Sequence, residues 1–289
     1  MSRFTADWLA LREPADIRAR ASAAWPEGID SGCAPTGEIL DLGAGTGANL
    51  RYLAPRLPTP QRWLLIDHDA GLLLRALQRV AHDGLRDTGI KISTQELDLA
   101  HALVTLAIPT AALVTASALL DLVSAQWLDV LLARCVAAQA SILFALNYDG
   151  RIELDPSEAD DRWLVDLDNL HQRGDKGFGP ALGPAAIDVA TARFVEAGYV
   201  VRRARSDWLL GPKDCELQRA LIDGWASAAT EITPAEAPRI AAWRARRKVS
   251  IESGRSQIRV GHHDLAGQPA GSGSNSRSNS TSAPIRNMR

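Results

Sequence analysis

The sequence predicts an α/β fold, a doubly wound and mostly parallel sheet with helices on both of its faces. Two observations support this prediction. Strand-like apolar segments alternate with helix-like segments over the first 150 residues, and a glycine-rich turn separates the first strand from the helix after it. Strands joined by helical crossovers pair in parallel, and the crossovers distribute the helices over both faces of the sheet.

The first five strands are expected where apolar and β-branched residues form short runs bounded by turn residues. These runs are residues 37–45, 62–69, 90–99, 111–120 and 140–150. Helices are expected between them where apolar residues recur every three to four positions, at residues 46–54, 70–85 and 124–139. The uncharged run at residues 102–120 reaches the roughly 20 residues of a membrane span. Pro109 interrupts it, so a turn followed by a buried strand explains it better.

An insertion follows the fifth strand, at residues 151–182. It exceeds the 2–6 residues of an ordinary strand-to-helix connection, and we expect it to form a helical lid. Ser157 and Asp160 resemble a capping box that opens a helix. In this helix the spacing predicts one packed face, formed by Trp163, Leu167 and Leu170, with His171 pointing to the same side.

After the insertion the chain is expected to return to the sheet. The expected elements are a helix at residues 184–199, a strand at 200–211, helices at 216–231 and 234–249, and a last strand at 256–265. Residues 31–266 then form the main domain, preceded by helices within residues 1–30, where Pro14 suits a first helical turn. The Ser/Gly/Asn-rich tail at residues 267–289 is expected to be disordered, because it has too few apolar residues to form a core.

Composition excludes several classes of protein. The chain is 46% hydrophobic with a formal net charge of −2, so no overall field attracts nucleic acid or an anionic membrane. Cys33, Cys135 and Cys215 are widely spaced, which predicts neither a disulfide framework nor a metal site. The N-terminal residues are too charged for a signal peptide, and we expect a cytoplasmic monomer or homodimer.

The stretch GEILDLGAGTGANL carries most of the functional information. Gly43, Gly45 and Gly47 let the backbone turn sharply between strand and helix and approach a ligand closely. Asp41 precedes this turn and disfavours a pyrophosphate there, whereas a cationic sulfonium or amino group would be attracted. Asp67 ends the next strand and can accept hydrogen bonds from two ribose hydroxyls. An NAD-binding domain is the alternative interpretation.

The motif ILDLGAGTG, with the acidic strand ends in LLIDHD and ELDLA, resembles the class I S-adenosylmethionine (SAM)-dependent methyltransferases over roughly residues 14–266. The resemblance implies a seven-stranded sheet whose last strand is antiparallel. It implies that Asp67 holds the ribose, that Asp98 lies near the adenine amino group, and that the glycine loop cradles the methionine part. The implied cofactor is SAM, with S-adenosylhomocysteine (SAH) as product and no metal. The cofactor-binding residues that we predict are Asp41, Gly43, Ala44, Gly45, Gly47, Asp67, His68, Asp98, Leu99 and Ser117.

The acceptor is expected beyond the carboxyl ends of the parallel strands, where ligands of such sheets bind. A general base is needed there only if the acceptor arrives protonated. Candidate catalytic residues are His171, Asp121 and Tyr148; candidate acceptor-contacting residues are Asn147, Asp175, Lys176 and Phe178. Each has a structural alternative, such as a helix start at Asp121 or a loop-holding hydrogen bond at His171.

The acceptor itself is expected to be a small molecule. Residues 151–176 contain eight acidic and four basic residues, which favours a neutral or cationic acceptor. The alternatives are a methyltransferase acting on protein or RNA, a SAM-binding module without activity, and an NAD(P) oxidoreductase. A basic cluster that could bind an acidic macromolecule is formed by Arg244, Arg246, Arg247 and Lys248.

Overall fold

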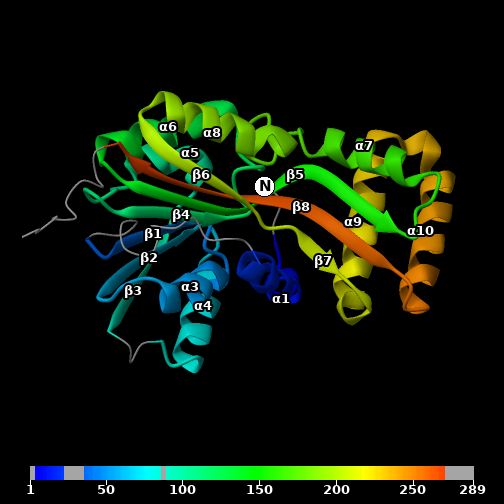
Figure 1. The fold of residues 1–289 in the computed structure, drawn as a ribbon, viewed down its shortest axis with the longest axis horizontal. Coiled ribbons are helices and arrows are strands. Elements are labelled where there is room, and N and C mark those ends of the chain that lie inside the picture. The colour runs from blue at the N-terminus through cyan, green and yellow to red at the C-terminus, as the bar shows by residue number, and fades with distance from the viewer. Residues whose placement is uncertain (1–3, 23–35, 86–88, 271–289) are drawn as a thin grey trace, which may run out of the picture.

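A computed structural model describes residues 4–22, 36–85 and 89–270 of the chain. Its centre is a mixed sheet with the strand order β3-β2-β1-β4-β5-β8-β6, and β7 lies beside one end of β8 (Figure 1). The pairs within β3-β2-β1-β4-β5 are parallel, and β8 pairs antiparallel with β5, β6 and β7. The strands are β1 (Glu38–Leu42), β2 (Gln61–Asp67), β3 (Ile90–Glu96), β4 (Leu113–Ser117), β5 (Ser141–Asp155), β6 (Tyr199–Arg205), β7 (Trp208–Leu210) and β8 (Gln257–Pro269).

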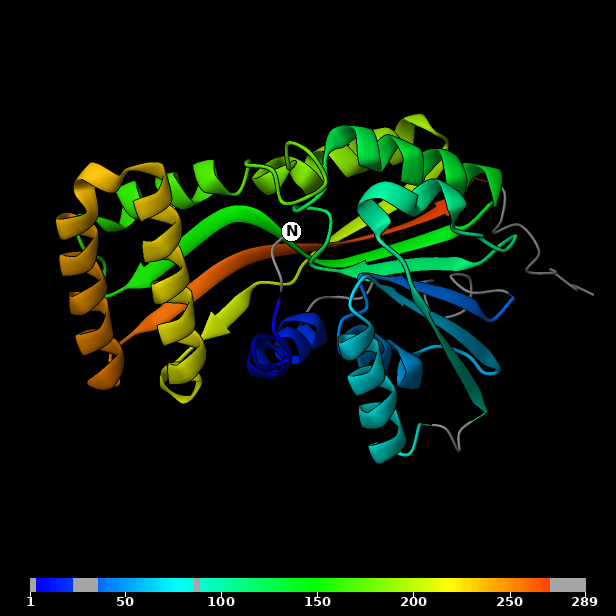
Figure 2. The same cartoon turned by 180° about the vertical axis from the view of Figure 1, so that it is seen from behind.

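Helices cover both faces of this sheet. On one face lie α5, α6 and α8, and on the other α3 and α4, while α9 and α10 stand side by side at the far end of β5 and β8 (Figures 1 and 2). The α-helices are α1 (Ala6–Ser22), α3 (Ala48–Leu53), α4 (Ala70–His82), α5 (Leu99–Ala102), α6 (Ala125–Ala137), α7 (Asp161–His171), α8 (Ala186–Glu196), α9 (Cys215–Ile232) and α10 (Ala237–Glu252). The predicted doubly wound α/β fold with an antiparallel last strand is therefore confirmed.

The number of strands differs from the expected seven. The segment expected as one strand at residues 200–211 is divided into β6 and β7. Between them Ser206 is fully buried, and its hydroxyl donates to Asp264 Oδ1 at 2.6 Å. The next residue, Asp207, accepts from Arg151 Nη2 at 2.8 Å. These side-chain bonds turn the backbone out of the regular ladder, so β7 pairs with β8 as a separate short strand.

The fifth strand is longer than expected and changes where the lid begins. Residues 151–155 continue β5 and pair with β8, with Ile152 opposite Val260 and Leu154 opposite Ile258. The register shifts twice, and Gly150 lies at φ +88° inside the second shift. Pairing shifts of this kind bend a strand and increase its twist. The bend carries the ends of β5 and β8 away from the main sheet toward α9 and α10 (Figure 1).

Helix α7 starts later than the sequence pattern indicated. Its N-cap is Asp160, and the carboxylate of Asp161 accepts the backbone N–H of Glu158 at 2.7 Å, so Ser157 does not cap it. The buried residues of α7 are Leu164 and Asp168, and Leu170 is 51% exposed. The predicted Trp163–Leu167–Leu170 face is thus wrong at Leu170, because α7 turns the Leu164–Asp168 side to the protein.

The described residues form three apolar cores, of which one packs α3 and α4 against β1 and β2 with Trp63 buried in it. The central core joins β1, β4 and β5 to α6 and α8, with Phe144, Trp127 and Phe194 buried at its middle. The distal core lies under α7, α9 and α10 and includes the fully buried Trp243. Helix α1 packs its Ala15 and Ala19 into this distal core. Burial of large aromatic side chains is a major source of stability in the central and distal cores.

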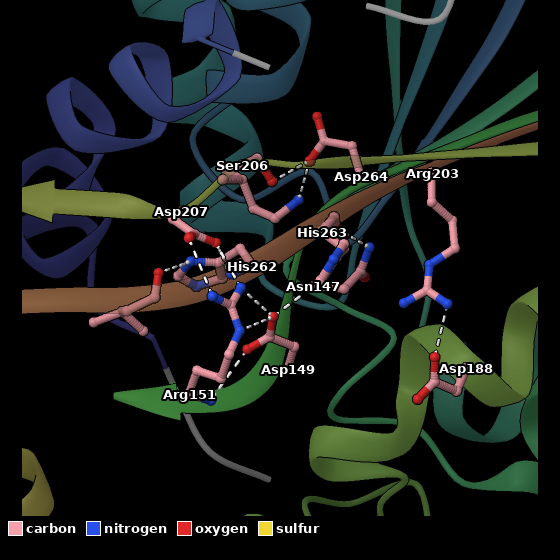
Figure 3. Close-up of polar contacts among 12 residues, drawn as sticks. Asn147, Asp149, Arg151, Asp188, Arg203, Ser206, Asp207, His262, His263 and Asp264 are labelled. Carbon is pink, nitrogen blue, oxygen red and sulfur yellow. Dashed lines mark hydrogen bonds and ion pairs between the residues drawn. The ribbon is translucent and has the colours of Figure 1, made fainter. Parts of the chain in front are cut away.

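A cluster of charged residues lies at the bend between the central and distal cores (Figure 3). Arg151 donates to Asp149 Oδ2 at 2.6 Å and to Asp207 Oδ1 at 2.8 Å, and His263 Nδ1 lies 3.0 Å from Asp149 Oδ2. Burial alone would raise the pKa of Asp149, but the hydrogen bonds from His263 and Arg151 lower it to about 2. A side chain at Gly261 would come within 2.2 Å of Asp149 Oδ1, so this position must be glycine. We call Asp149, Arg151, Asp207 and His263 the bend cluster.

The two ends of the chain are only partly described. Helix α1 runs from Ala6 to Ser22, so Pro14 lies inside the helix and not in its first turn as expected; residues 23–35 lie outside the described ranges. Residues 267–269, expected in the tail, complete β8, and residues 271–289 lie outside the described part. Among the helices that the structure describes, none is long and apolar enough to cross a membrane.

Candidate functional site

The glycine loop joins β1 to α3 at the carboxyl end of the sheet. Gly45 and Gly47 have φ values of +53° and +77°, which favour glycine. A Cβ atom at Gly45 would lie 2.9 Å from Leu9 Cδ1 of α1, and one at Gly47 would lie 3.1 Å from Ala76 Cβ of α4. The loop is therefore held close to two helices, and its backbone faces the adjoining cavity without side chains.

Asp67 ends β2 and organises the neighbouring loops. Its Oδ2 accepts the backbone N–H of Gly45 at 2.8 Å, and its Oδ1 accepts that of Asp69 at 3.0 Å. Asp69 caps α4 by accepting from the N–H groups of Gly71 and Leu72. A carboxylate has about four acceptor sites, so Asp67 retains capacity for a ligand after these two bonds. Only 6% of Asp67 is exposed.

A cavity with about 910 Å³ of empty space, part of it open to solvent, adjoins these residues. Its lining includes predicted cofactor residues: Gly43, Gly45, Asp67, His68, Asp98, Leu99 and Ser117. It also includes the predicted acceptor contacts Lys176 and Phe178, and residues that were not predicted: Phe4, Leu9, Arg12, Ala118, Leu119 and Leu122. Asp69, Leu72 and Leu97 complete the lining.

Asp98 lies at the opening of α5 on the cofactor side. Its Oδ1 accepts the N–H of Ala100 at 2.9 Å, and its Oδ2 lies 2.9 Å from His101 Nδ1. Burial is the largest single influence and raises the pKa of Asp98, but the hydrogen bonds from His101 and Ala100 and the charges of His101 and His68 together lower it. This side chain is therefore an ionised acceptor at the rim of the cavity.

Three predicted cofactor residues lie behind the cavity wall. Ala44 is buried and its N–H donates to Ile66 O at 2.9 Å, and Gly47 caps α3. Asp41 is fully buried; its Oδ1 accepts from Asn49 Nδ2 at 2.7 Å, and its Oδ2 has no partner among the described residues. Burial raises the pKa of Asp41 to about 7. Asp41 thus supports the loop from below, and its direct contact with a ligand stays a prediction.

None of the three predicted catalytic side chains lines the cavity. Tyr148 donates to Asn169 Oδ1 at 2.9 Å, which ties β5 to α7, and burial raises the pKa of its hydroxyl. Asp121 lies between the lining residues Leu119 and Leu122, and its buried Oδ1 has no partner among the residues that the structure places. Burial raises the pKa of Asp121 to about 6, although its own backbone amide and the charge of Arg12 oppose the shift.

The segment from the end of α7 through residue 182, which we call the lid loop, brings Lys176 and Phe178 to the cavity. His171 and Asp175 do not line the cavity. Phe178 meets Trp127 edge to face with ring centroids 5.6 Å apart, and Lys176 lies beside it in the lining. Asp175 instead accepts the N–H groups of Gly177 and Gly179 and shapes its own loop. His171 lies behind Lys176, with its Nδ1 3.1 Å from Lys176 Nζ.

Asn147, the remaining predicted acceptor contact, is 1% exposed within the sheet. It donates to the backbone oxygens of Phe144 and His263 where β5 and β8 change register. Its carboxamide therefore satisfies the backbone of the bulge and does not reach the cavity in this conformation.

Two of the lining residues that were not predicted belong to α1. Leu9 and Arg12 reach the cavity because α1 packs across β7 and the glycine loop, a contact between segments far apart in the chain. The Arg12–Asp16 pair at i, i+4 was readable as a helix pair, with Nε 3.0 Å from Oδ2. That spacing predicts which face of α1 is charged, but it does not predict which residues this face contacts.

Comparisons with known proteins add no functional assignment. No protein-family model and no curated protein matches the chain. Among solved structures, the YcgJ protein from Bacillus subtilis is similar at 12% identity, 83% of this chain, 94% of that chain and a TM-score of 0.46. The cyclopropane synthase MmaA2 from Mycobacterium tuberculosis is similar at 12% identity, with 92% and 87% of the two chains covered and a TM-score of 0.42. The Haemonchus contortus phosphoethanolamine N-methyltransferase 2 reaches 14% identity, 80% and 48% coverage and a TM-score of 0.38. Similarity at this level carries no argument about activity, so the function must be argued from the cavity itself.

Proposed function

We propose that the protein is a SAM-dependent methyltransferase that moves a methyl group to a small-molecule acceptor by direct displacement, with SAH as the other product. The observation that carries this proposal is the pairing of Asp67 with the glycine loop. Its carboxylate holds the Gly45 N–H and lines the same cavity as Gly43 and Gly45. An acidic strand end and a side-chain-free loop on one cavity are what a nucleoside with an aminoacyl arm requires.

The residues present fit SAM group by group. Asp67 retains acceptor sites for ribose hydroxyls, and Asp98 can accept from an adenine amino group. Leu72, Leu97 and Leu99 provide apolar surface for a purine ring. The backbone of the glycine loop can approach the methionine part because Gly43 and Gly45 line the cavity without side chains. A side chain at Gly45 would also collide with Leu9. When bound, the cofactor supplies a methyl group on a good leaving group, and the chain has to align the acceptor with it and exclude water.

NAD(P) fits the site less well. A pyrophosphate would rest at the glycine loop, where the buried carboxyl of Asp41 lies underneath. A pyrophosphate would oppose ionisation of Asp41, whose pKa burial already raises to about 7, whereas a nearby sulfonium group would favour its ionised form. Among the described residues that line the cavity, the acidic Asp67, Asp69 and Asp98 outnumber the basic Arg12 and Lys176, which does not favour a pyrophosphate.

A small acceptor is favoured over a macromolecule by the remaining lining and by the basic cluster. Phe4, Leu9, Leu119, Leu122 and Phe178 add apolar surface to the cavity. The basic cluster on α10 is engaged within the protein. Arg244 and Lys248 pair with Asp223, Arg246 with Glu158 and Asp160, and Arg247 with Asp161. Cations that are already paired offer little attraction to a polyanion.

Thermal-shift measurements with SAM, SAH and NAD test the cofactor assignment. SAM and SAH should stabilise the protein, and NAD should not. Asp67→Asn should lower SAH affinity by about 10- to 100-fold, since it removes charge-assisted hydrogen bonds to hydroxyls. Asp188→Asn is the matched control, because Asp188 lies on α8 in an ion pair with Arg203. Stabilisation by NAD alone would contradict the proposal.

Incubation with methyl-deuterated SAM and a metabolite extract tests the transfer itself. Mass-labelled products that disappear with Asp67→Asn, but not with Asp188→Asn, are the expected result. SAH binding without any labelled product from small molecules, and with labelled protein or RNA instead, would favour the macromolecular alternative. Binding without transfer to either would leave a SAM-binding module.

A further inference from the structure

We propose that Lys176 takes the proton that the acceptor loses on methylation, and that His171 and Glu231 pass this proton to solvent. The inference rests on the proposed function and specifies its acceptor class. The methylated atom carries a proton before transfer, as a hydroxyl, a thiol or an ammonium group does. An acceptor that is already a tertiary amine would need no such route.

Lys176 has the position that a proton acceptor requires. It lines the cavity beside Phe178, and its Nζ lies 3.1 Å from His171 Nδ1 and 3.0 Å from His171 O. A neutral amine has two hydrogens and one lone pair. Both hydrogens are used by the two His171 acceptors, so the lone pair is the part of Nζ that stays unengaged by these bonds.

His171 connects Lys176 to the surface. Its other ring nitrogen, Nε2, lies 3.1 Å from Glu231 Oε2 of α9. An imidazole can accept a proton at one nitrogen while it releases one at the other. The Lys176 side of the ring therefore accepts and the Glu231 side donates. The Glu231 side chain is 66% exposed, so water can take the proton from this end.

The surrounding charges allow Lys176 to act as a base. Burial lowers the pKa of Lys176, and the nearby carboxylates of Asp168 on α7 and Glu231 on α9 oppose that shift without cancelling it. Asp168 is itself 2% exposed, and burial raises the pKa of its carboxyl to about 6 against the charges of His171 and Lys176. A lysine with a lowered pKa is a more abundant neutral base near neutral pH than a free lysine is.

The guanidinium of Arg12, which also lines the cavity, is unsuitable as a base. Arg12 forms a two-bond pair with Asp16, Nε to Oδ2 at 3.0 Å and Nη2 to Oδ1 at 3.2 Å. A guanidinium does not lose its proton in proteins. Arg12 can donate a hydrogen bond to the acceptor but cannot take its proton. Asp121 is the competing base, and the experiment below separates it from Lys176.

The reaction balances through this route. The bond between sulfur and the methyl carbon breaks as the bond between that carbon and the acceptor atom forms, and the electron pair of the broken bond stays on sulfur. The acceptor's proton moves to Lys176 Nζ. Lys176 then gives a proton to His171 Nδ1 while the Nε2 proton leaves toward Glu231 and water. One proton is released for each methyl group transferred.

Selective labelling of lysines measures the ionisation of Lys176 without an acceptor. The SAH-bound protein is treated briefly with acetic anhydride across a pH series, and acetylation of each lysine is read by peptide mass spectrometry. The midpoint for Lys176 should lie below that of the exposed Lys213, which is the internal control. Equal midpoints would overturn the proposal.

The pH dependence of transfer tests the relay in the enzyme. The readout is the rate of labelled product from methyl-deuterated SAM and the metabolite extract. Wild-type rates should fall toward acid pH as Lys176 becomes protonated. Lys176→Met should lower the rate by about 100-fold or more and remove this acid limb, with SAH affinity unchanged. Lys213→Met is the matched control and should behave as the wild type.

Chemical rescue tests the role of His171 as a relay residue. His171→Ala should lower the rate, and added imidazole should restore part of it, which a purely structural loss would not allow. Glu231→Gln should have a smaller effect than His171→Ala, because solvent can replace an exposed carboxylate. If product forms but Lys176→Met keeps the acid limb and Asp121→Asn removes it, the relay is wrong and Asp121 is the base. If SAH does not bind, the proposed function itself fails.

Discussion

Two buried carboxyl groups, Asp41 under the glycine loop and Asp149 in the bend cluster, show opposite electrostatics. Asp149 meets Arg151 and His263, and these partners hold its pKa at about 2 despite burial. Asp41 meets the neutral Asn49 through one oxygen, its other oxygen has no partner among the described residues, and burial raises its pKa to about 7.

The difference separates a structural charge from one that is incompletely satisfied. The bend cluster neutralises its acids with Arg151, and it fixes β5 and β8 where the strand register shifts. Under the glycine loop, Asp41 is 0% exposed, and one of its carboxyl oxygens has no partner among the described residues. Proteins tolerate such unsatisfied groups at functional sites, where a ligand completes the interactions. A contact between Asp41 and a cationic group of a ligand stays a prediction.

The largest expected effect is on the pH dependence of stability through Asp41. Between its unfolded value of 3.8 and its folded value of about 7, the folded protein keeps a proton that the unfolded chain releases. The free energy of unfolding should therefore fall as pH rises through this window, by up to roughly 4 kcal/mol. Asp41→Asn should abolish this slope. Urea unfolding of both proteins from pH 4 to 8 measures it, and a constant difference between them would contradict the assignment.

The next largest effect is expected in the bend cluster. Arg151→Met leaves Asp149 and Asp207 without their shared cation and should lower the free energy of unfolding by about 3 kcal/mol. SAH affinity of the folded protein should stay unchanged, because Arg151 does not line the cavity. Arg162→Met is the control, since its pair with Asp166 is exposed and should contribute less than about 1 kcal/mol. Weakened SAH binding in Arg151→Met would show that the two regions are coupled.

The smallest effect concerns the contact between the glycine loop and α1. Gly45→Ala introduces strain at φ +53° and a contact with Leu9, whereas Gly84→Ala introduces similar strain at φ +68° with no atom within 4 Å. Gly84→Ala should cost about 1 kcal/mol of stability, and Gly45→Ala about 1 kcal/mol more, with weaker SAH binding. Calorimetry of SAH binding and urea unfolding measure both. Adding Leu9→Ala should restore part of the Gly45→Ala loss; no recovery would place the strain in the loop alone.

Much of the fold was readable from local patterns, and the errors have local causes. The alternating segments predicted the strands and helices of the parallel half, and Gly198, at φ +84°, follows the C-cap residue of α8. The division of the expected strand at residues 200–211 was not readable, because it depends on Ser206 and Asp207 bonding to Asp264 and Arg151 from other parts of the chain. The extension of β5 to Asp155 likewise depends on its pairing with β8.

The candidate site divides in the same way. Asp67, Gly43 and Gly45 were predicted because strand ends and tight turns have sequence signatures, and the structure brings these three residues to one cavity. Arg12 and Leu9 had no such signature, since a helix pattern does not reveal which distant loop the helix meets. His171 was predicted as a direct participant, but the lid loop places Lys176 between it and the cavity.

The sequence by itself determined the order of strands and helices, the glycine turn and the acidic strand ends, because periodicity, turn chemistry and side-chain charge act over a few residues. Only the tertiary structure decided which charges are satisfied and which side chains share the cavity. Asp41 and Asp149 are both aspartates in apolar strands of the same sheet, and their pKa values differ because one meets Arg151 and His263 and the other meets Asn49. Electrostatic partners of this kind are brought together by packing between distant segments, which no local pattern encodes.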